Sequence, residues 1–97
     1  MYTSGLWTVK EGREEEFVRR WEASAQTAAM EFQGVKLMLL RDAENPGRFL
    51  SLAEGWRNRE QIDAMRATPE FQDSMASIWR MLDSGETAIF ELAVEVS

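Results

Sequence analysis

The sequence contains no cysteine and no histidine. Without cysteine it has no disulfide, no thiolate nucleophile, and no sulfur ligand for zinc or iron–sulfur clusters. Without histidine it also lacks the usual general base and the usual protein ligand of haem iron and zinc. Any chemistry must therefore use carboxylates, hydroxyls, amides, Lys, Arg, the one tyrosine, or the reactivity of the bound molecule itself. We expect no metal site and no cofactor.

Basic residues are also scarce, since 11 Lys and Arg stand against 17 Asp and Glu, which gives a net charge of −6. Binding to nucleic acid or to an anionic membrane surface needs clustered Lys and Arg, and the sequence contains no such cluster. No apolar run approaches the roughly 20 residues of a membrane span, and no signal-peptide pattern follows Met1. We therefore expect a cytoplasmic protein without nucleic-acid or membrane partners.

Residues 45–56 form the segment around which the rest of the chain is arranged. The triplet Asn45-Pro46-Gly47 predicts a turn, because proline has a restricted φ and glycine tolerates positive φ. Residues 48–53 then alternate as a strand, and Gly55 and Trp56 end it. The alternation places Leu50 and Leu52 on one face of this strand and Phe49, Ser51 and Ala53 on the other.

The other elements follow from alternation and from helical spacing. We predict strands at residues 2–10, 35–41 and 86–96 and a long helix at 13–30 that ends before a left-handed Gly34. Asn58 predicts the start of a short helix, and Thr68-Pro69 the start of another that runs to Leu82. The order β-α-β-β-α-β predicts a single α+β domain over residues 1–97, a ferredoxin-like sandwich with a four-stranded, antiparallel-rich sheet.

The strands at 35–41 and 48–53 are apolar on both faces, which indicates that both sides of the sheet are buried. Helices cover one side, and the chain supplies no cover for the other. A chain of 97 residues also buries only about 60–65% of its unfolded surface, so self-association would stabilise it. We therefore expect a homodimer in which two sheets pack face to face.

Several short segments carry a resemblance to a known family. They are Val9–Phe17, Trp21, Gly34, Leu40–Asp42, Asn45–Pro46, Arg48–Phe49, Gly55–Trp56 and Met65–Phe71. With them, nearly the whole chain resembles the antibiotic biosynthesis monooxygenase (ABM) domains of the dimeric α+β barrel superfamily. The resemblance implies a homodimer with a pocket between sheet and helices in each subunit. The best-known members oxidise aromatic polyketides such as anthrones with molecular oxygen, without metal or flavin, and others oxidise quinols.

Another branch of this family degrades haem, and the resemblance lets that activity be checked at single positions. The branch has an Asn on its first strand, a Trp in the helix after the third strand, and a His about ten residues later. Aligned through Gly12 and residues 69–71, those positions hold Gly5, Met65 and Met75 here. The sequence therefore disfavours haem degradation.

The anthrone and quinol branch needs less from the protein. An electron-rich phenol, once deprotonated, reduces oxygen itself, so the protein supplies an apolar pocket, hydrogen bonds or a base, and exclusion of water. The candidate catalytic residues are Glu54 and Asn58, and the candidate ligand is a small aromatic molecule. The candidate pocket residues are Trp7, Phe49, Ser51, Trp56, Met65, Phe71, Met75 and Trp79.

Plainer interpretations compete with these assignments. Trp21 and Trp79 lie on helical stripes that are typical of core packing, Met65 and Met75 are common gap-fillers, and Glu54 would also suit an ion pair with a neighbouring arginine. We therefore expect a cofactor-independent monooxygenase or quinol oxidase acting on a hydroxylated aromatic molecule. The alternative is a non-catalytic domain that binds a small molecule or serves as a dimeric accessory module.

Overall fold

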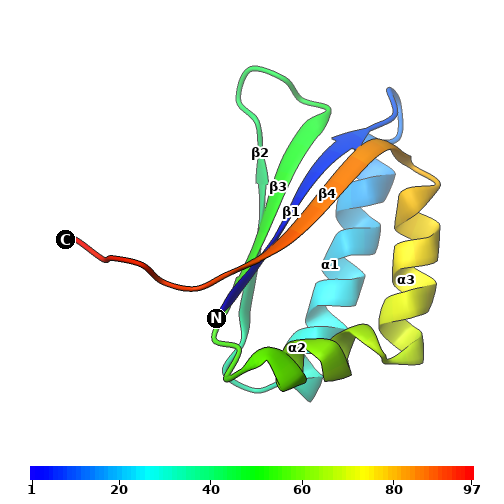
Figure 1. Ribbon diagram of the computed structural model, residues 1–97. Helices are drawn as coiled ribbons and strands as arrows, with labels where there is room; N and C mark the ends of the chain where they lie inside the picture. Colours follow the sequence, from blue (N-terminus) through cyan, green and yellow to red (C-terminus); the bar gives the residue numbers. More distant parts are fainter.

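The computed structural model describes residues 1–97. The elements in chain order are β1 (Tyr2–Val9), α1 (Glu14–Glu31), β2 (Lys36–Arg41), β3 (Arg48–Glu54), α2 (Arg59–Arg66), α3 (Pro69–Trp79) and β4 (Leu82–Phe90) (Figure 1). The strands form one four-stranded sheet in the order β2-β3-β1-β4, and every neighbouring pair is antiparallel. The predicted α+β ferredoxin-like fold is confirmed.

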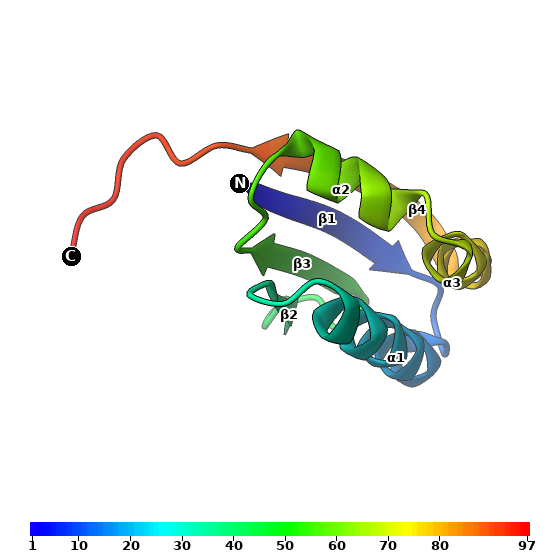
Figure 2. The same cartoon turned by 90° about the horizontal axis from the view of Figure 1, so that it is seen from below.

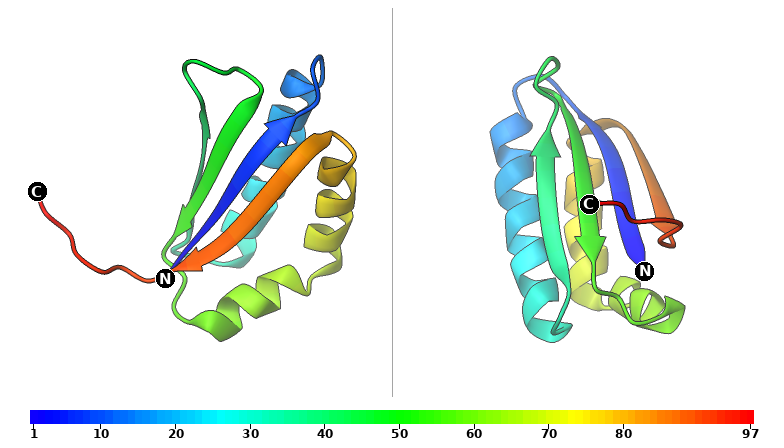
Figure 3. Two further views of the ribbon diagram at one scale, coloured as in Figure 1. Left: turned by 45° about the horizontal axis from the view of Figure 1, so that its top comes forward. Right: turned by 90° about the vertical axis from the view of Figure 1, so that its left-hand side faces the viewer.

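All the helices lie on one face of the sheet. The helices α1 and α3 run side by side along that face, and α2 lies near the end of the sheet where the chain begins (Figures 1 and 2). The right-hand view of Figure 3 looks onto the opposite face, which no helix covers. No helix combines the length and the apolar character needed to cross a membrane.

The starts of the two shorter helices are capped as predicted. The side chain of Asn58 accepts a hydrogen bond from the backbone N–H of Gln61 at 2.9 Å, and that of Thr68 accepts one from Phe71 at 3.2 Å. Pro69 occupies the first turn of α3, where its missing N–H costs nothing. Asn58 thus fixes the entry from β3 into α2, and Thr68 fixes the corner between α2 and α3. Together they orient the side chains that both helices present to the sheet.

Side chains on β3 alternate between the two faces of the sheet, as predicted. Phe49 and Ala53 are buried under the helices, and Ser51 points the same way. Leu50 and Leu52 point to the opposite face, which we call the open face. The strand thus supplies both a wall of the helix-side interior and an apolar centre of the open face.

The predicted boundary between the last helix and the last strand was wrong. The helix α3 ends at Trp79, and Leu82 already belongs to β4, where it pairs with Val9. The stripe of apolar residues continues past the end of the helix because Met81 and Leu82 remain buried, one in the turn and one in the strand. Gly85, which precedes the predicted strand, lies inside β4 opposite Trp7.

The predicted last strand at residues 86–96 also extends too far. The strand ends at Phe90, which pairs with Tyr2, the first residue of β1. Because β1 begins there, a longer β4 would have no partner in this chain. Residues 91–97 lie outside the sheet and extend away from it (Figure 1), with Leu92, Val94 and Val96 exposed.

The loop between β2 and β3 is held by side-chain bonds to its own backbone. One oxygen of Asp42 accepts from the N–H groups of Glu44 and Asn45 at 2.9 and 3.2 Å, and Asn45 accepts from Gly47 at 3.2 Å. The Glu44 N–H, followed by the Asn45 N–H and the Arg48 guanidinium, lowers the pKa of the Asp42 carboxyl against an opposing effect of desolvation. The charged carboxylate therefore stabilises this turn.

Asp42→Asn should reduce the amount of stability that the protein loses between neutral and acid pH. Because the folded pKa of Asp42 is lowered, its contribution is fully present above the unfolded pKa and is lost as the pH falls through the folded pKa. Urea unfolding at neutral pH and at about pH 3 tests this. The urea concentration at the midpoint should fall less between the two pH values for Asp42→Asn than for wild type. Glu44→Gln, at an exposed neighbouring carboxylate, is the control. Equal drops in all three proteins would contradict a role for Asp42.

Candidate active site

The core between sheet and helices is divided into two hydrophobic clusters. One is centred on Phe17, Phe49 and Ile78, and the other on Trp56 and Ile62. Between them lies a cavity of about 350 Å³, within the size range of small-molecule pockets. Residues from all the strands and all the helices line it, so the whole fold contributes to its shape.

The cavity walls are mainly apolar and aromatic. Thirteen of the 19 lining residues are hydrophobic, so a molecule that fills the cavity must be largely apolar. The chain has four tryptophans, and every one of them lines this cavity. The aromatic and methionine side chains of the lining are Trp7, Trp21, Trp56, Met65, Phe71, Met75 and Trp79.

Two glycines make room for the tryptophans at one end of the cavity. A β-carbon on Gly5 would overlap the indole of Trp7, which lies across this residue, and would approach Ser51 Oγ to 2.7 Å. A β-carbon on Gly85 would stand 2.8 Å from both Trp7 and Trp79. These two rings pack edge to face at 6.0 Å, a favourable aromatic geometry. The absence of a side chain at Gly5 and Gly85 thus allows the indole rings of Trp7 and Trp79 to take these positions in the wall.

Two indole N–H groups orient hydroxyls in the cavity. Trp7 Nε1 donates to Ser51 Oγ at 3.0 Å, and Trp56 Nε1 donates to Thr3 Oγ1 at 3.1 Å. Ser51 passes its own hydrogen to the Gly5 carbonyl at a long 3.4 Å, whereas Thr3 donates to no protein group. Each hydroxyl therefore accepts from an indole N–H. Thr3 keeps its hydrogen free for a bound molecule, whereas Ser51 must first give up its long bond to Gly5.

Arg66 is the one charged residue in the lining. It lies in the last turn of α2, is half-buried, and forms no ion pair or side-chain hydrogen bond with the protein. No Asp or Glu lines the cavity, and no three Asp or Glu side chains come together as a metal site. The cavity therefore combines apolar walls, a few hydroxyls and one cation.

The sequence profile of the antibiotic biosynthesis monooxygenase family matches residues 2–77. This chain belongs to the ABM family. No curated protein matches the sequence. Among solved structures, SnoaB, a cofactor-independent oxygenase from Streptomyces nogalater, is 19% identical with a TM-score of 0.86, over 98% of this chain and 94% of SnoaB.

Two further solved structures share the fold of this ABM domain. A protein described as an antibiotic biosynthesis monooxygenase is 17% identical with a TM-score of 0.85, over 96% of this chain and 98% of its own. A conserved protein from Methanosarcina mazei is 19% identical with a TM-score of 0.82, over 92% and 88% of the two chains. At such identities the likeness establishes the fold.

Most of the predicted pocket residues of the ABM domain lie on the cavity wall, and Phe49 is the exception. Its ring packs against Phe17 with centroids 5.0 Å apart, inside the first cluster. Trp21 and Trp79 were interpreted mainly as core, yet both line the cavity, and Trp79 is 46% exposed. The residues placed on the wall as predicted are Trp7, Ser51, Trp56, Met65, Phe71, Met75 and Trp79.

The predicted catalytic candidates, Glu54 and Asn58, do not line the cavity. Glu54 follows Ala53, whose side chain faces the helices, so alternation directs Glu54 to the open face. Asn58 is exposed, and its side-chain oxygen caps α2. Neither position gives a carboxylate or amide access to a molecule in the cavity.

Several lining residues were not identified from the sequence, although two of them carried a signal. Thr3 lies four residues before Trp7 on one strand and so shares its face. Arg66 lies four residues after the buried Ile62 on α2, which places it on the inward side. The sequence around Thr87 does not predict that this residue lines the cavity, because the face on which it lies depends on how β4 pairs with β1.

Proposed function

We propose that this ABM domain is an oxygenase that oxidises a hydroxylated aromatic molecule bound in the cavity, with dioxygen as the oxidant and without metal or flavin. The observation that supports the proposal most is the cavity itself, an apolar space of about 350 Å³ walled by every tryptophan of the chain. Membership of the ABM family and the fold shared with SnoaB point in the same direction.

The chemistry asks little of the protein. An ionised phenol or enol transfers an electron to dioxygen, the two radicals combine at carbon, and the peroxide loses water. When a CH₂ group becomes a carbonyl, one atom of dioxygen enters the product and the other leaves as water. A hydroquinone instead gives two electrons and two protons to dioxygen, which yields a quinone and hydrogen peroxide.

Residues of the cavity have distinct roles in this proposal. The tryptophan, methionine and phenylalanine side chains hold the aromatic ring and exclude water, which keeps its anion poorly solvated and reactive. The Thr3 hydroxyl donates to an oxygen of the substrate, and the Ser51 hydroxyl does so after it leaves the Gly5 carbonyl. Because no carboxylate lines the cavity, the substrate loses its proton to bulk water as it enters, before the walls exclude water.

We also propose that the protein is a homodimer joined through the open faces of two sheets. The leucines at the centre of the open face are neighbours across three strands, with Leu50 paired to both Leu6 and Leu40. Leu40 is 47% exposed and Phe90 54% exposed in the single chain. An apolar surface of this kind is typical of an interface between protein chains.

Oxygen uptake by the purified protein, free of metal and flavin, tests the proposed reaction. We expect uptake above autoxidation with at least one member of a panel of anthrones and hydroquinones. Ala25→Phe places a ring in the cavity and should lower the rate by roughly 100-fold. Ala29→Phe makes the same change at an exposed site of α1 and should keep the rate. Equal rates in both variants would overturn the assignment of the reaction to this cavity.

The absence of a carboxylate from the cavity lining supports one other function, a binding domain without catalysis. A binding domain would show quenching of tryptophan fluorescence by members of the same panel, since every tryptophan lines the cavity. It would show no oxygen uptake with them. Binding and uptake measured on one preparation therefore separate the two functions.

A further inference from the structure

We propose that Arg66 makes the cavity selective for aromatic molecules that carry an anionic oxygen, which its guanidinium binds at the end of the cavity nearest α2. The inference rests on the proposed use of the cavity for an aromatic molecule and adds the charge of that molecule. The source of the anionic oxygen is either a carboxylate substituent or an ionised phenol.

Arg66 forms no ion pair, unlike four of the other arginines. Arg13, Arg41, Arg48 and Arg59 each pair with a carboxylate, at 2.8, 3.2, 3.5 and 3.4 Å. Arg66 has no such partner, although the chain carries 17 Asp and Glu. Arg19, Arg20, Arg57 and Arg80 also lack an ion pair, but all four are exposed to solvent. Arg66 is therefore the half-buried arginine without a carboxylate partner, and it lines the cavity.

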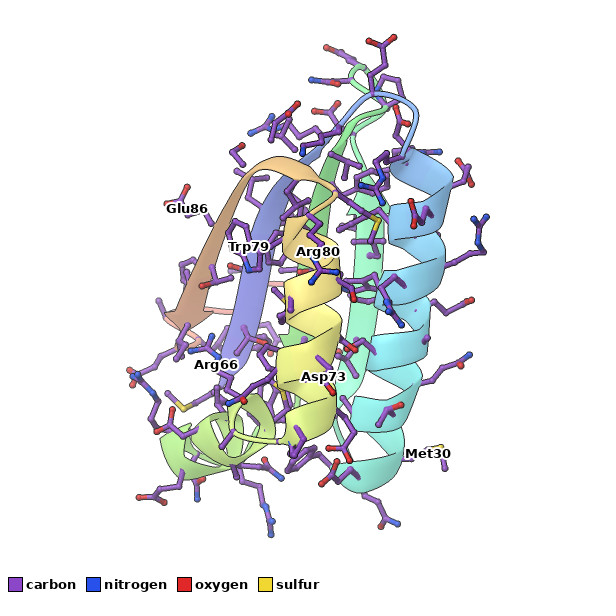
Figure 4. The ribbon with its side chains drawn as sticks, turned by 90° about the vertical axis from the view of Figure 1, so that its right-hand side faces the viewer. Met30, Arg66, Asp73, Trp79, Arg80 and Glu86 are labelled. Atoms are coloured by element: carbon purple, nitrogen blue, oxygen red, sulfur yellow. The ribbon has the colours of Figure 1, made fainter.

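The position of Arg66 follows from the packing of α2. Ile62 and Met65 are buried on the inward side of this helix, and Arg66 follows them in its last turn. Figure 4 shows Arg66 at the end of α2 and Trp79 at the end of α3, both on the side where α3 faces β4. Arg66 thus joins the apolar wall that includes Met65 and Trp79.

A half-buried guanidinium beside apolar walls favours an anion for physical reasons. Charge-assisted hydrogen bonds are about twice as strong as neutral ones, and a planar guanidinium binds a carboxylate through two parallel bonds. Partial burial also weakens the screening that water gives to a surface ion pair. Since no carboxylate lines the cavity, nothing in the lining repels the incoming anion.

Calorimetric titration in the absence of oxygen tests this selectivity with three bicyclic probes. They are naphthalene-2-carboxylate, its neutral carboxamide, and a polyfluorinated naphthol that is ionised at neutral pH. We expect the wild type to bind the carboxylate, the naphtholate, or both at least about tenfold more tightly than the carboxamide. The probe with the larger preference identifies the source of the anionic oxygen.

Three variants assign the preference to Arg66. Arg66→Gln should lose it while the carboxamide affinity stays within about twofold of wild type, since only the charge-assisted bonds are removed. Arg66→Lys should retain part of it, because lysine keeps the charge but not the paired geometry. Arg19→Gln makes the same change of net charge at an exposed arginine of α1 and should keep the full preference.

Other results would overturn the inference. They are a carboxamide that binds the wild type as tightly as both anions, an anion preference that survives in Arg66→Gln, or no binding of any probe. The outcome is separate from that of the oxygenase proposal. Arg66-dependent anion binding without oxygen uptake leaves this inference standing and removes the reaction, whereas uptake with unselective binding does the reverse.

Discussion

Gly55→Ala should lower the free energy of unfolding by about 3 kcal/mol or more. Gly55 has a φ of +96°, a region that an alanine occupies only with strain. A β-carbon there would also overlap the carbonyl oxygen of Gly34 and stand 3.2 Å from the Cα of Val35. These are backbone atoms, which cannot rotate out of the way as a side chain can. The two costs therefore add.

Gly12→Ala separates those two costs. Gly12 has a nearly equal φ of +89°, but a β-carbon on it would meet nothing within 4 Å. Its substitution should therefore cost only the conformational part, about 1 kcal/mol. Urea unfolding of both variants gives the difference, which measures the contact between the Gly55 and Gly34 backbones. Equal losses would show that the Gly34 turn moves aside without cost.

Leu50→Asp should convert the proposed dimer into a monomer that remains folded. Leu50 lies at the centre of the open face between Leu6 and Leu40, so a packed partner would bury the new carboxylate without a counter-charge. By symmetry the interface would contain two such carboxylates, each costing a few kcal/mol, which raises the dimer Kd by roughly 1,000-fold or more. The monomer itself leaves this face open, so its own core stays intact.

Light scattering at micromolar concentration and circular dichroism together test this expectation. The wild type should have twice the mass of the chain, and Leu50→Asp the mass of one chain with wild-type secondary structure. Met30→Asp is the matched control, because Met30 is 81% exposed at the end of α1, away from the sheet (Figure 4). A wild-type monomer would remove the proposed interface, and a dimeric Leu50→Asp would place it elsewhere.

Features of the fold that depend on near neighbours in the chain were predictable. The caps Asn58 and Thr68 and the left-handed Gly34 follow from local chemistry, which the structure bears out. Alternation on β3 follows from the period of a strand, and it separated the buried Phe49 from the open-face Leu50. Helical spacing likewise predicted α1 to within one residue at each end.

The errors fall where distant parts of the chain set the outcome. The end of β4 at Phe90 depends on where β1 begins, which no alternation within residues 86–96 encodes. Glu54 is a different kind of error, because the alternation that places Ala53 under the helices already directs Glu54 to the other side of the sheet. Phe49 was taken for a wall because the sequence does not reveal its contact with Phe17.

The sequence by itself determined the elements, their order, the apolar faces and the absence of His and Cys chemistry, because each of these depends on residue type and short-range periodicity. Only the tertiary structure decided that the core splits into two clusters with a cavity between them. The cavity exists because side chains from distant parts of the chain do not fill the space between the two clusters. Its lining therefore includes residues from every strand and every helix. For the same reason, only the assembled fold shows that Arg66 is the single charge within it.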